Sequence, residues 1–335
     1  MRINGFEIGK SCFIIAEIGN NHEGDFETAK MLVEQAAEAG VNAVKFQTLR
    51  AEKLVARSEE QRFLQLIKFE LSNDQYRELA ALSKSKGLIF ISTPFDFESA
   101  DMLDELVPVF KIASGDLTNH ALIDHVARKD KPVFLSTGMG TDEEIAEALE
   151  TIKSASTIPL KEKVVLLHCI SSYPTPIDQA NLLSIPYLRE RFNVLTGYSD
   201  HTLGALACQT AVALGACVIE KHFTYRKKDQ VFRDHHLSLE PGEMAELVEN
   251  IRQIEKSLGQ PLKGVMDCER ANQEPMRRSV AARRALRAGE IITRESITFL
   301  RPANGIPARH WLSVIGRRVL RDIQEGMILR EEDLQ

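Results

Sequence analysis

The stretch CFIIAEIGNNHEGDFETAKMLVEQAAEAG, residues 12–40, contains the unit from which the fold can be predicted. Its first part, residues 12–18, is a short apolar run of the kind that forms a buried strand. An amphipathic segment then extends from Asp25, a favourable helix N-cap, to Gly40, a favourable helix stop. We therefore predict a buried strand followed by a helix.

Seven further units of this kind follow along the chain. Their apolar runs occupy residues 43–48, 88–93, 109–114, 132–137, 164–169, 194–199 and 217–223, and a helical pattern comes after each of them. Eight buried strands that alternate with helices are typical of a closed parallel (β/α)8 barrel, the TIM barrel. An open doubly wound sheet is the alternative, but no G-x-G-x-x-G motif follows the first strand.

The end of the chain differs from the barrel in pattern and in charge. We predict a barrel domain over residues 1–260, a linker over 261–278 and a small β-rich domain over 279–335, with strand signals at 279–285 and 291–300. From Arg277 onward there are 12 Lys and Arg against 7 Asp and Glu, whereas the rest of the chain has 30 against 41. Two interpretations are open. The basic and acidic segments could be two differently charged surfaces of one molecule, or the basic domain could be a module that meets an acidic partner surface or an anionic ligand.

Composition argues against several classes of protein, namely nucleic-acid-binding, membrane-spanning and secreted proteins. The formal net charge of −6 argues against a nucleic-acid-binding protein, and the chain lacks an apolar run long enough to span a membrane. The N-terminal residues lack the apolar core of a signal peptide. The five cysteines are odd in number and include no C-x-x-C pair, as in reduced proteins. We expect a cytoplasmic protein with no nucleic-acid or membrane partner.

Polar residues gather where the predicted strands end. In TIM barrels the chemistry takes place at the C-terminal ends of the strands. The residues at these ends are Glu17, Lys45, Gln47, Thr93, Lys111, Ser114, Ser136, Ser199, Asp200, Glu220 and His222. We therefore expect the functional site at this end of the barrel.

Two lysines, Lys45 and Lys111, lie inside apolar strands, where an ammonium group is costly to bury unless an anion pairs with it. Three interpretations are open. The lysines could form internal ion pairs with Glu17 or Glu220, or they could bind a phosphate and a carboxylate of a ligand. One of them could instead form a Schiff base, since a desolvated lysine is a good nucleophile.

Two histidines follow neighbouring strands. His201 comes after the seventh predicted strand and His222 ends the eighth, so two imidazoles could share one divalent metal ion. A single histidine at a strand end is more often a hydrogen-bonding residue, and His235 and His236 in a polar loop are rival ligands. The absence of an H-E-x-x-H motif argues against a zincin-type site.

Hydroxyl side chains recur around the same predicted rim. They are Thr93, Ser114, Ser136, Ser171 and Ser199. One such residue carries little information, but five around one rim are suited to donate hydrogen bonds to anionic oxygens. Glu17, at the end of the first strand, is an acid that could orient a water or a substrate hydroxyl.

Sequence motifs spread over nearly the whole chain support a resemblance to a known family. In order they are IIAEIGNNHEGD (14–25), AVKFQT (43–48), STPFD (92–96), KIASGDLTN (111–119), STGM (136–139), LLHCISSYPTP (166–176), GYSDHT (197–202), IEKHFT (219–224) and SLEPGE (238–243). Together they resemble the sialic acid synthase family, which includes N-acetylneuraminate, legionaminic and pseudaminic acid synthases and spore-coat polysaccharide enzymes. The tail, with RSVAARRALRAGEIIT and LRPANGI, resembles the antifreeze-like (SAF) domain of that family.

The resemblance implies a TIM barrel joined to an SAF domain, and a domain-swapped homodimer in which each SAF domain closes the barrel of the other subunit. It implies that His201 and His222 bind a divalent metal, usually Mn²⁺, with Mg²⁺ or Co²⁺ as alternatives. The residues implied to hold phosphoenolpyruvate are Lys45, Thr93, Lys111, Ser114, Ser136, Ser171 and Ser199. Those implied to contact the sugar are Glu17, Gln47, Tyr173, Asp234 and, from the other subunit, Arg301.

The reaction implied is the condensation of phosphoenolpyruvate with an N-acylated hexose, such as N-acetylmannosamine or a 2,4-diacetamido-trideoxyhexose, with release of phosphate. The catalytic residues would be Glu17, Lys45, Lys111, His201 and His222. Three rival functions stay open. They are a synthase for a phosphorylated hexose, a Schiff-base aldolase that cleaves such products, and a non-catalytic sugar-binding protein. The last would not need two lysines and two histidines at one rim.

Overall fold

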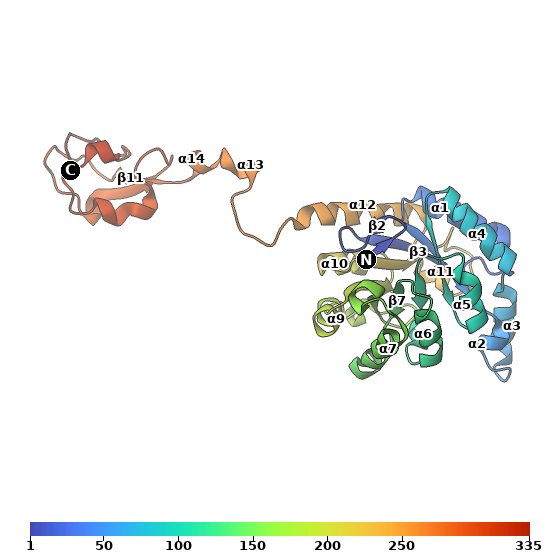
Figure 1. Ribbon diagram of the computed structural model, residues 1–335. Coiled ribbons are helices and arrows are strands. Elements are labelled where there is room, and N and C mark those ends of the chain that lie inside the picture. The colour runs from blue at the N-terminus through green and yellow to red at the C-terminus, as the bar shows by residue number, and fades with distance from the viewer. The chain divides into compact units, whose positions relative to one another are not determined.

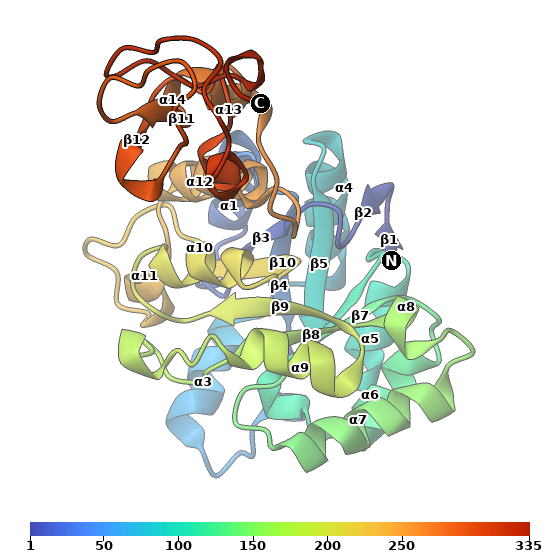
Figure 2. The same cartoon turned by 90° about the vertical axis from the view of Figure 1, so that its left-hand side faces the viewer.

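The computed structural model describes all 335 residues and divides them into two compact units, Met1–Gly259 and Gln260–Gln335. The first unit is a barrel of parallel strands with helices outside them (Figures 1 and 2). Its hydrogen-bonded strand order is β5-β4-β3-β10-β9-β8-β7-β6. Residues of the two end strands, β5 and β6, also approach within 8 Å between Cα atoms. The barrel is therefore nearly closed, and the predicted TIM barrel is confirmed.

The barrel strands lie where the apolar runs predicted them. They are β3 (Phe13–Gly19), β4 (Ala43–Thr48), β5 (Ile89–Pro94), β6 (Phe110–Ile112), β7 (Val133–Ser136), β8 (Val164–Cys169), β9 (Leu195–Asp200) and β10 (Val218–His222). Strand β6 is shorter than predicted because a 3-10 helix begins at Ser114, two residues after the strand ends.

Helices follow the strands and cover their outer face. They are α1 (Phe26–Glu38), α2 (Ala51–Leu54), α3 (Glu60–Phe69), α4 (Asn73–Ser85), α5 (Phe97–Asp104), α6 (His120–Ala127), α7 (Asp142–Ala155), α8 (Leu160–Lys163), α9 (Ser184–Phe192), α10 (Leu206–Ala213), α11 (Asp234–Leu237) and α12 (Pro241–Leu258). The predicted cap is confirmed, because the Thr28 backbone N–H donates to the Asp25 carboxylate at 2.6 Å. Gly40, with φ of +80°, follows the end of α1 in the left-handed conformation that stops helices.

Side chains along each strand alternate between two buried layers, as the period of two in a strand requires. One layer packs against the helices and includes Ile14 on β3, Val44 on β4 and Ile219 on β10. The other fills the barrel interior and includes Phe13 and Val218. The residues that end each strand therefore divide between a helix-facing side and an interior side, and only the interior side can line a central cavity.

A small hairpin completes the interior layer at the start of the chain. Strands β1 (Arg2–Ile3) and β2 (Phe6–Glu7) pair antiparallel, and Ile3 is buried in the same cluster as Phe13. The rings of Phe6 and Phe13 meet edge to face at 5.0 Å between centroids. Phe13 begins β3, so the hairpin packs at the N-terminal ends of the strands, and the C-terminal ends are left for a site.

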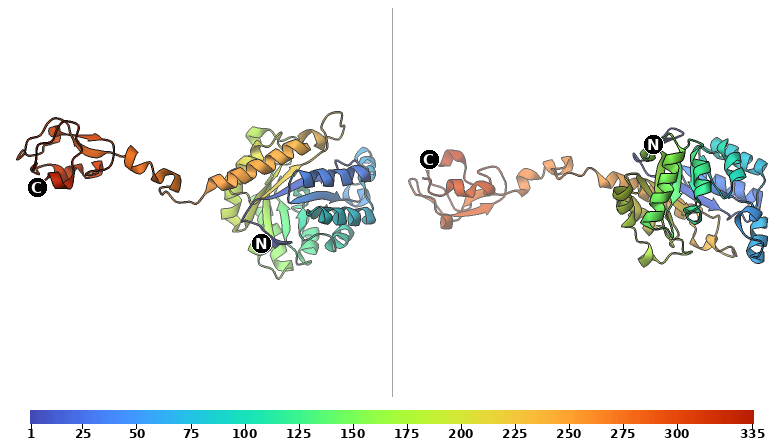
Figure 3. Two further views of the ribbon diagram at one scale, coloured as in Figure 1. Left: turned by 90° about the horizontal axis from the view of Figure 1, so that it is seen from above. Right: turned by 60° about the horizontal axis from the view of Figure 1, so that its bottom comes forward.

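The long helix α12 lies along the outside of the barrel strands, where Figure 3 shows it in orange. It begins with Pro241 in its first turn and buries Met244, Leu247 and Ile251 in the helix-facing layer. None of the helices combines the length and the apolar character that a membrane crossing requires. The five cysteines are all free of disulfides.

The second unit contains the segment predicted as a linker and the small β-rich domain. Short helices α13 (Asp267–Arg270) and α14 (Gln273–Met276) lie in the linker segment. Strands β11 (Ser279–Ala282) and β12 (Ile297–Leu300) pair antiparallel over a core that includes Val280 and Leu329. Both strands are shorter than their sequence signals, because turns and a 3-10 helix, Arg294–Ser296, occupy the remainder.

Candidate functional site

A cavity of about 310 Å³ opens at the C-terminal ends of the barrel strands. It brings together all but two of the predicted site residues. Those that line it are Glu17, Lys45, Gln47, Thr93, Lys111, Ser114, Ser136, Ser171, Tyr173, Ser199, His201 and His222. The alternation of side chains along each strand explains which strand-end residues line the cavity. On β10, Glu220 and His222 face the cavity, whereas Lys221 between them faces the helices.

Four buried charges form the floor of this cavity. Lys45 Nζ lies 2.8 Å from Glu17 Oε2 and 3.6 Å from Glu220 Oε1, and Lys111 Nζ lies 3.8 Å from the same Glu220 oxygen. The Ser199 hydroxyl donates to Glu220 Oε1 at 2.9 Å. Burial alone would lower the pKa of Lys45, but the Glu17 and Glu220 carboxylates raise it, so Lys45 carries its positive charge at neutral pH.

Lys111 is the least satisfied of these charges. Its ammonium group makes one hydrogen bond, to the Ile112 carbonyl at 3.2 Å, and its carboxylate neighbour is at 3.8 Å. Burial lowers the pKa of Lys111, and the positive charge of Lys45 adds to this effect while Glu220 opposes it. The Ser136 hydroxyl, on the neighbouring strand, is buried with no hydrogen-bond partner. Buried donors without acceptors are costly, so the part of the cavity floor beside Lys111 and Ser136 is suited to an anionic group of a ligand.

Glu17 is held between a cation and an amide. Gln47 Nε2 donates to Glu17 Oε1 at 3.3 Å, and Asn20 Nδ2 donates to Gln47 Oε1 at 2.8 Å. Burial raises the pKa of Glu17 to about 7, with Lys45 opposing and Glu220 adding to the rise. A carboxyl group with this pKa can exchange a proton near neutral pH, which general acid–base chemistry requires.

The two predicted histidines lie side by side at the cavity wall, with 5.4 Å between ring centroids. His201 Nδ1 is 2.7 Å from the Ile170 carbonyl, which fixes the proton on Nδ1 and leaves Nε2 with its lone pair. His222 Nδ1 is buried without a partner, and burial, followed by the charge of His201, lowers the pKa of His222 well below its usual value. Burial lowers the pKa of His201, but the Cys169 thiol and the Ile170 carbonyl outweigh it and raise this pKa above its ordinary value. His222 therefore offers a neutral nitrogen, and His201 offers one when its ring is deprotonated.

Tyr173 closes one side of the cavity over these histidines. Its ring centroid is 4.1 Å from that of His201 and 6.1 Å from that of His222. The Arg233 guanidinium lies 4.8 Å from the Tyr173 ring centroid and also lines the cavity. The wall thus presents an aromatic face and a cation to whatever enters above the charged floor.

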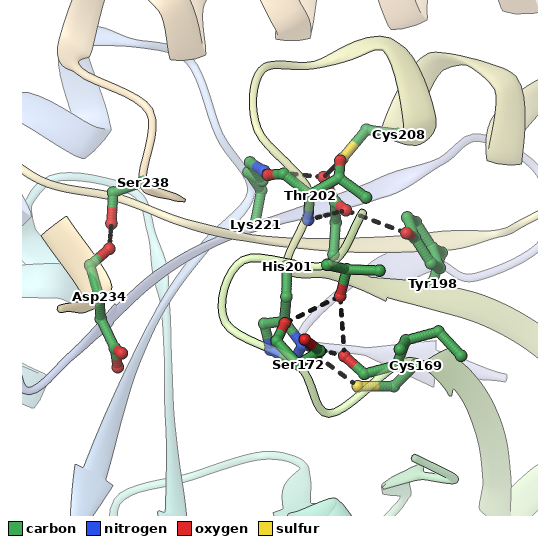
Figure 4. A network of polar contacts seen from close by, with 12 residues as sticks. Cys169, Ser172, Tyr198, His201, Thr202, Cys208, Lys221, Asp234 and Ser238 are labelled. Carbon is green, nitrogen blue, oxygen red and sulfur yellow. Dashed lines mark hydrogen bonds and ion pairs between the residues drawn. The ribbon is translucent and has the colours of Figure 1, made fainter. Parts of the chain in front are cut away.

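Two predicted residues do not line the cavity. Asp234 begins α11, is buried, and contacts Arg233 Nε at 3.2 Å, while its backbone carbonyl accepts from Ser238 at 2.6 Å (Figure 4). Burial raises the pKa of Asp234, and the nearby Arg233 charge opposes this. Arg301 belongs to the second unit, where it follows β12 as an exposed residue.

The rival histidines have other partners. His235 Nδ1 lies 2.6 Å from the Thr224 hydroxyl and its Nε2 lies 3.2 Å from Glu23. His236 is exposed on α11. The structure therefore favours His201 and His222 as the pair with nitrogens available for a ligand.

Comparison with known proteins assigns the chain to a family. A family model described as the NeuB family matches residues 32–263, and one for the SAF domain matches residues 277–335. The chain belongs to the NeuB family. The resemblance predicted from the motifs is therefore confirmed, as is the SAF domain at the end of the chain.

Relatives within and beyond bacteria match nearly end to end. An N,N'-diacetyllegionaminic acid synthase of Campylobacter jejuni is 40% identical over 96% of this chain and 100% of its own length. A human N-acetylneuraminate-9-phosphate synthase is 35% identical over 96% of this chain and 92% of its own. The solved structure of a sialic acid synthetase of Leptospira borgpetersenii, in complex with citrate, is 34% identical with a TM-score of 0.76, over 81% of this chain and 94% of that chain.

Members of the NeuB family generally use a divalent metal, and the cavity can be tested for its fit to one. No group of three or more His, Cys, Asp and Glu residues is arranged to hold an ion. The pair His201 and His222 could supply two ligands to such an ion. His222 Nδ1 has no hydrogen-bond partner in the protein, and His201 is hydrogen-bonded through Nδ1, so its Nε2 is free. A metal held there would take its remaining ligands from substrate or water.

Several cavity residues were not predicted as site residues. Glu220 was recognised as a strand-end acid and a possible ion-pair partner, but its central position follows only from its direct pairing with Ser199 across β9 and β10. Cys169 lines the cavity 3.6 Å from His201 Nδ1, and its place at the end of β8 was a usable signal. Arg233 and Met139 lie on loops. Met139 ends the STGM motif, but no pattern indicated either residue as part of the site.

Proposed function

We propose that this NeuB-family protein is a nonulosonic acid synthase that condenses phosphoenolpyruvate with an N-acylated hexose and releases phosphate. The observation that carries the proposal is the under-satisfied Lys111 beside Lys45 at the floor of the cavity, opposite the His201 and His222 pair. Two buried cations suit a ligand with two anionic groups, and phosphoenolpyruvate carries a phosphate and a carboxylate.

The ligand would be held by the lysines together with the rim hydroxyls. Lys45 and Lys111 would neutralise the phosphate and carboxylate, and the hydroxyls would donate the remaining hydrogen bonds. The hydroxyl donors proposed are Thr93, Ser114, Ser136, Ser171 and Ser199, all of which line the cavity. The Ser136 hydroxyl is the most direct candidate, because nothing in the protein accepts its proton.

The sugar would lie above this floor, against Tyr173 and Gln47. We keep Asp234 as a proposed sugar contact that acts through Arg233, since Arg233 is the one of the pair that reaches the cavity. The sugars proposed are N-acetylmannosamine or a 2,4-diacetamido-trideoxyhexose.

The chemistry forms one C–C bond and, from water, one C–O bond, and it breaks the C–O bond to phosphate. The C3 carbon of phosphoenolpyruvate attacks the aldehyde carbon of the open-chain sugar, and the aldehyde oxygen takes up a proton. Water then adds at C2 and loses one proton. The tetrahedral carbon expels inorganic phosphate, which takes up the proton of the remaining C2 hydroxyl, and the keto acid is left. Glu17, with its pKa near 7, is the group proposed to accept the proton of that water.

A divalent ion, proposed to be Mn²⁺ with Mg²⁺ or Co²⁺ as alternatives, would be held by His201 and His222. When bound it would polarise the aldehyde oxygen as a Lewis acid. The protein's own part is to keep the His222 imidazole neutral and to hold the two rings 5.4 Å apart between centroids. Removal of divalent ions with a chelator is expected to stop turnover, and addition of Mn²⁺ is expected to restore it.

The test is phosphate release from phosphoenolpyruvate in the presence of a panel of N-acylated hexoses and their 6-phosphates, with product mass measured in parallel. We expect release only with an N-acylated hexose, and a product whose mass equals sugar plus pyruvate. Release with the 6-phosphates alone would favour the phosphorylated-hexose alternative, and the name of the human relative describes a phosphorylated product. No release with any sugar would reject a synthase.

A Schiff-base aldolase is the second candidate, because burial lowers the pKa of Lys111 and so makes its amine available. We expect no imine, since both lysines are assigned to anions. Borohydride trapping with pyruvate or a nonulosonic acid, followed by mass spectrometry, tests this. A reduced adduct on Lys111 or Lys45 would reverse the assignment.

We propose that the protein is cytoplasmic and that it forms a domain-swapped homodimer, with Arg301 of one subunit at the cavity of the other. The support is the charge pattern. Basic residues outnumber acidic ones in the SAF segment, whereas acidic residues outnumber basic ones in the barrel segment, so the two surfaces would attract each other. At a sugar concentration well below its KM, Arg301→Ala is expected to be weakly active and His222→Ala inactive. Co-refolding should recover activity in heterodimers, because one of the two sites then combines an intact barrel with an intact SAF domain. No recovery, with heterodimers confirmed by native mass spectrometry, would show that the SAF domain acts in cis or not at all.

A further inference from the structure

A second buried ion pair lies on the helix-facing side of β9 and β10, behind the cavity wall. Lys221 Nζ is 2.8 Å from Asp200 Oδ2, and both side chains have an exposed fraction of 0%. The two residues are directly opposite each other in the strand register. Figure 4 shows Lys221 close to Tyr198, Thr202 and Cys208, the other residues of this network.

The Asp200 carboxylate is fully occupied by donors from the protein. Its Oδ1 accepts from the Tyr198 hydroxyl at 3.0 Å and from the Thr202 backbone N–H at 2.8 Å. Its Oδ2 accepts from the Thr202 hydroxyl and the Cys208 thiol, each at 3.2 Å, in addition to Lys221. No lone pair is left for a ligand, so this cluster is not a binding site.

Stability alone gives a poor account of this network. The layer around it is apolar and includes Ile219 and Val212, and a buried ion pair in such a layer often contributes no more than an apolar pair of similar volume. An ion pair does impose directed contacts that apolar side chains do not. The question is therefore which part of the structure these directed contacts fix.

The contacts converge on the backbone at both sides of His201. Asp200 precedes His201, and Thr202 follows it. Two hydrogen bonds hold the Thr202 backbone, because its N–H donates to Asp200 and its carbonyl accepts from Lys221 Nζ at 2.5 Å. The His201 carbonyl accepts from the Thr175 backbone N–H at 2.9 Å. Lys221 is also the residue before His222, so one side chain links the two histidine segments.

We propose that Asp200 and Lys221 are positioning residues that hold the His201 and His222 imidazoles at the separation one divalent ion can bridge. The proposal rests on the proposed function, because it takes the two histidines to be metal ligands. Neither Asp200 nor Lys221 lines the cavity, so they act through the histidines and not on the substrate.

The test uses the double variant Asp200→Asn/Lys221→Met, which removes both charges but leaves an oxygen to accept from Thr202 and Tyr198. Mn²⁺ binding to the full-length protein without substrate is measured by the EPR signal of free Mn²⁺, and folding by circular dichroism and thermal unfolding. We expect affinity to fall about tenfold, the low end of the loss when a residue that supports a metal ligand is removed, because Asp200 and Lys221 bond to the backbone beside His201 and not to its ring. Hydrogen exchange in the peptide spanning residues 198–204 should also become faster.

Lys163→Met is the matched control. Lys163 is another lysine with an exposed fraction of 0%, bound to the Ala127 carbonyl at 2.8 Å, and it lies at the opposite end of the barrel strands. It tests for the general effect of losing a buried lysine, and its Mn²⁺ affinity should equal that of the wild type. A double variant that folds and binds Mn²⁺ as tightly as the wild type would overturn the proposal.

A milder pair of variants decides the matter if the double variant does not fold. Tyr198→Phe removes one hydroxyl that donates to Asp200, whereas Thr196→Val removes a hydroxyl of the same strand that has no hydrogen-bond partner. We expect weaker Mn²⁺ binding in the first and no change in the second. Equal binding in the two would also overturn the proposal.

The wild type and His222→Ala separate this proposal from the one it rests on. If the wild type binds Mn²⁺ no better than His222→Ala does, the metal assignment within the proposed function is wrong. If the wild type binds and His222→Ala does not, the assignment stands. The double variant then tests the positioning role alone.

Discussion

The two sides of the barrel sheet bury charge in opposite ways. On the helix-facing side, the Asp200 carboxylate accepts hydrogen bonds from Lys221, Tyr198, Thr202 and Cys208. On the cavity side, Lys111 makes a single hydrogen bond and the Ser136 hydroxyl makes none. A buried polar group costs free energy until it is paired. The contrast indicates that the cavity side is completed by a ligand, whereas the helix-facing side is complete without one.

The largest expected effect on stability comes from removing the Asp200 carboxylate on the helix-facing side. Asp200→Leu leaves the Lys221 ammonium buried without its carboxylate, so the free energy of unfolding should fall by about 3–5 kcal/mol. Urea denaturation measures this. A loss below about 1 kcal/mol, in the range of an ordinary surface substitution, would contradict the contrast between the two sides.

The cavity side should respond in the opposite way to loss of a lysine. Lys111→Met is expected to lower kcat/KM about 10²- to 10³-fold, the usual cost of removing a preorganised charge stabiliser. The free energy of unfolding should stay the same or rise, because the methionine relieves the burial of a poorly paired ammonium. Stability and activity are measured on the same preparation. A variant that loses stability and keeps activity would show that Lys111 is structural.

The pH dependence tests Glu17 on the same side. Below its pKa of about 7 Glu17 is protonated and cannot accept the proton of water, so kcat/KM should fall about tenfold per pH unit below 7 and level off above it. Glu17→Gln should be slow at every pH and should lose this acidic limb, while it keeps the hydrogen-bonding shape of the side chain. An unchanged limb in Glu17→Gln assigns the titration to another group.

The contrast between the two sides also shows which features can be predicted from the sequence and which cannot. Apolar runs of strand length predicted the barrel, and their ends predicted nearly all of the cavity, because a period of two places every second side chain inside. Asp200 and Glu220 both appeared among the strand-end residues. Their different roles depend on which face each occupies and which donors surround it, and those partners come from distant elements such as α10.

Other features were beyond the sequence patterns for identifiable reasons. The strands of the β1–β2 hairpin have two residues each, which is too short for a recognisable alternation. Arg233, and not Asp234, reaches the cavity because the chain turns into α11 at this point, and loop conformation is not encoded in periodicity. The metal, the sugar and the swapped dimer stay predictions that rest on the family resemblance and the charge pattern.

The smallest expected effect concerns an exposed cation of the SAF domain. Arg301→Ala should raise the KM for the sugar about tenfold, the value of one charge-assisted hydrogen bond, and should leave the KM for phosphoenolpyruvate unchanged. Stability should change by less than about 0.5 kcal/mol, because Arg301 is exposed. Arg309→Ala, another exposed arginine of the same domain, is the control and should behave as the wild type. Equal KM values for both variants would remove Arg301 from the site.

The most direct test of the central claim is calorimetric titration of phosphoenolpyruvate into the wild type, Lys111→Met and Lys163→Met. The cavity cation and the control cation are both buried lysines, and each makes one hydrogen bond to a backbone carbonyl. We predict that the wild type and Lys163→Met bind phosphoenolpyruvate with equal affinity, and that Lys111→Met loses at least about tenfold. Binding to Lys111→Met as tight as to the wild type would contradict the claim that the cavity is built for an anion.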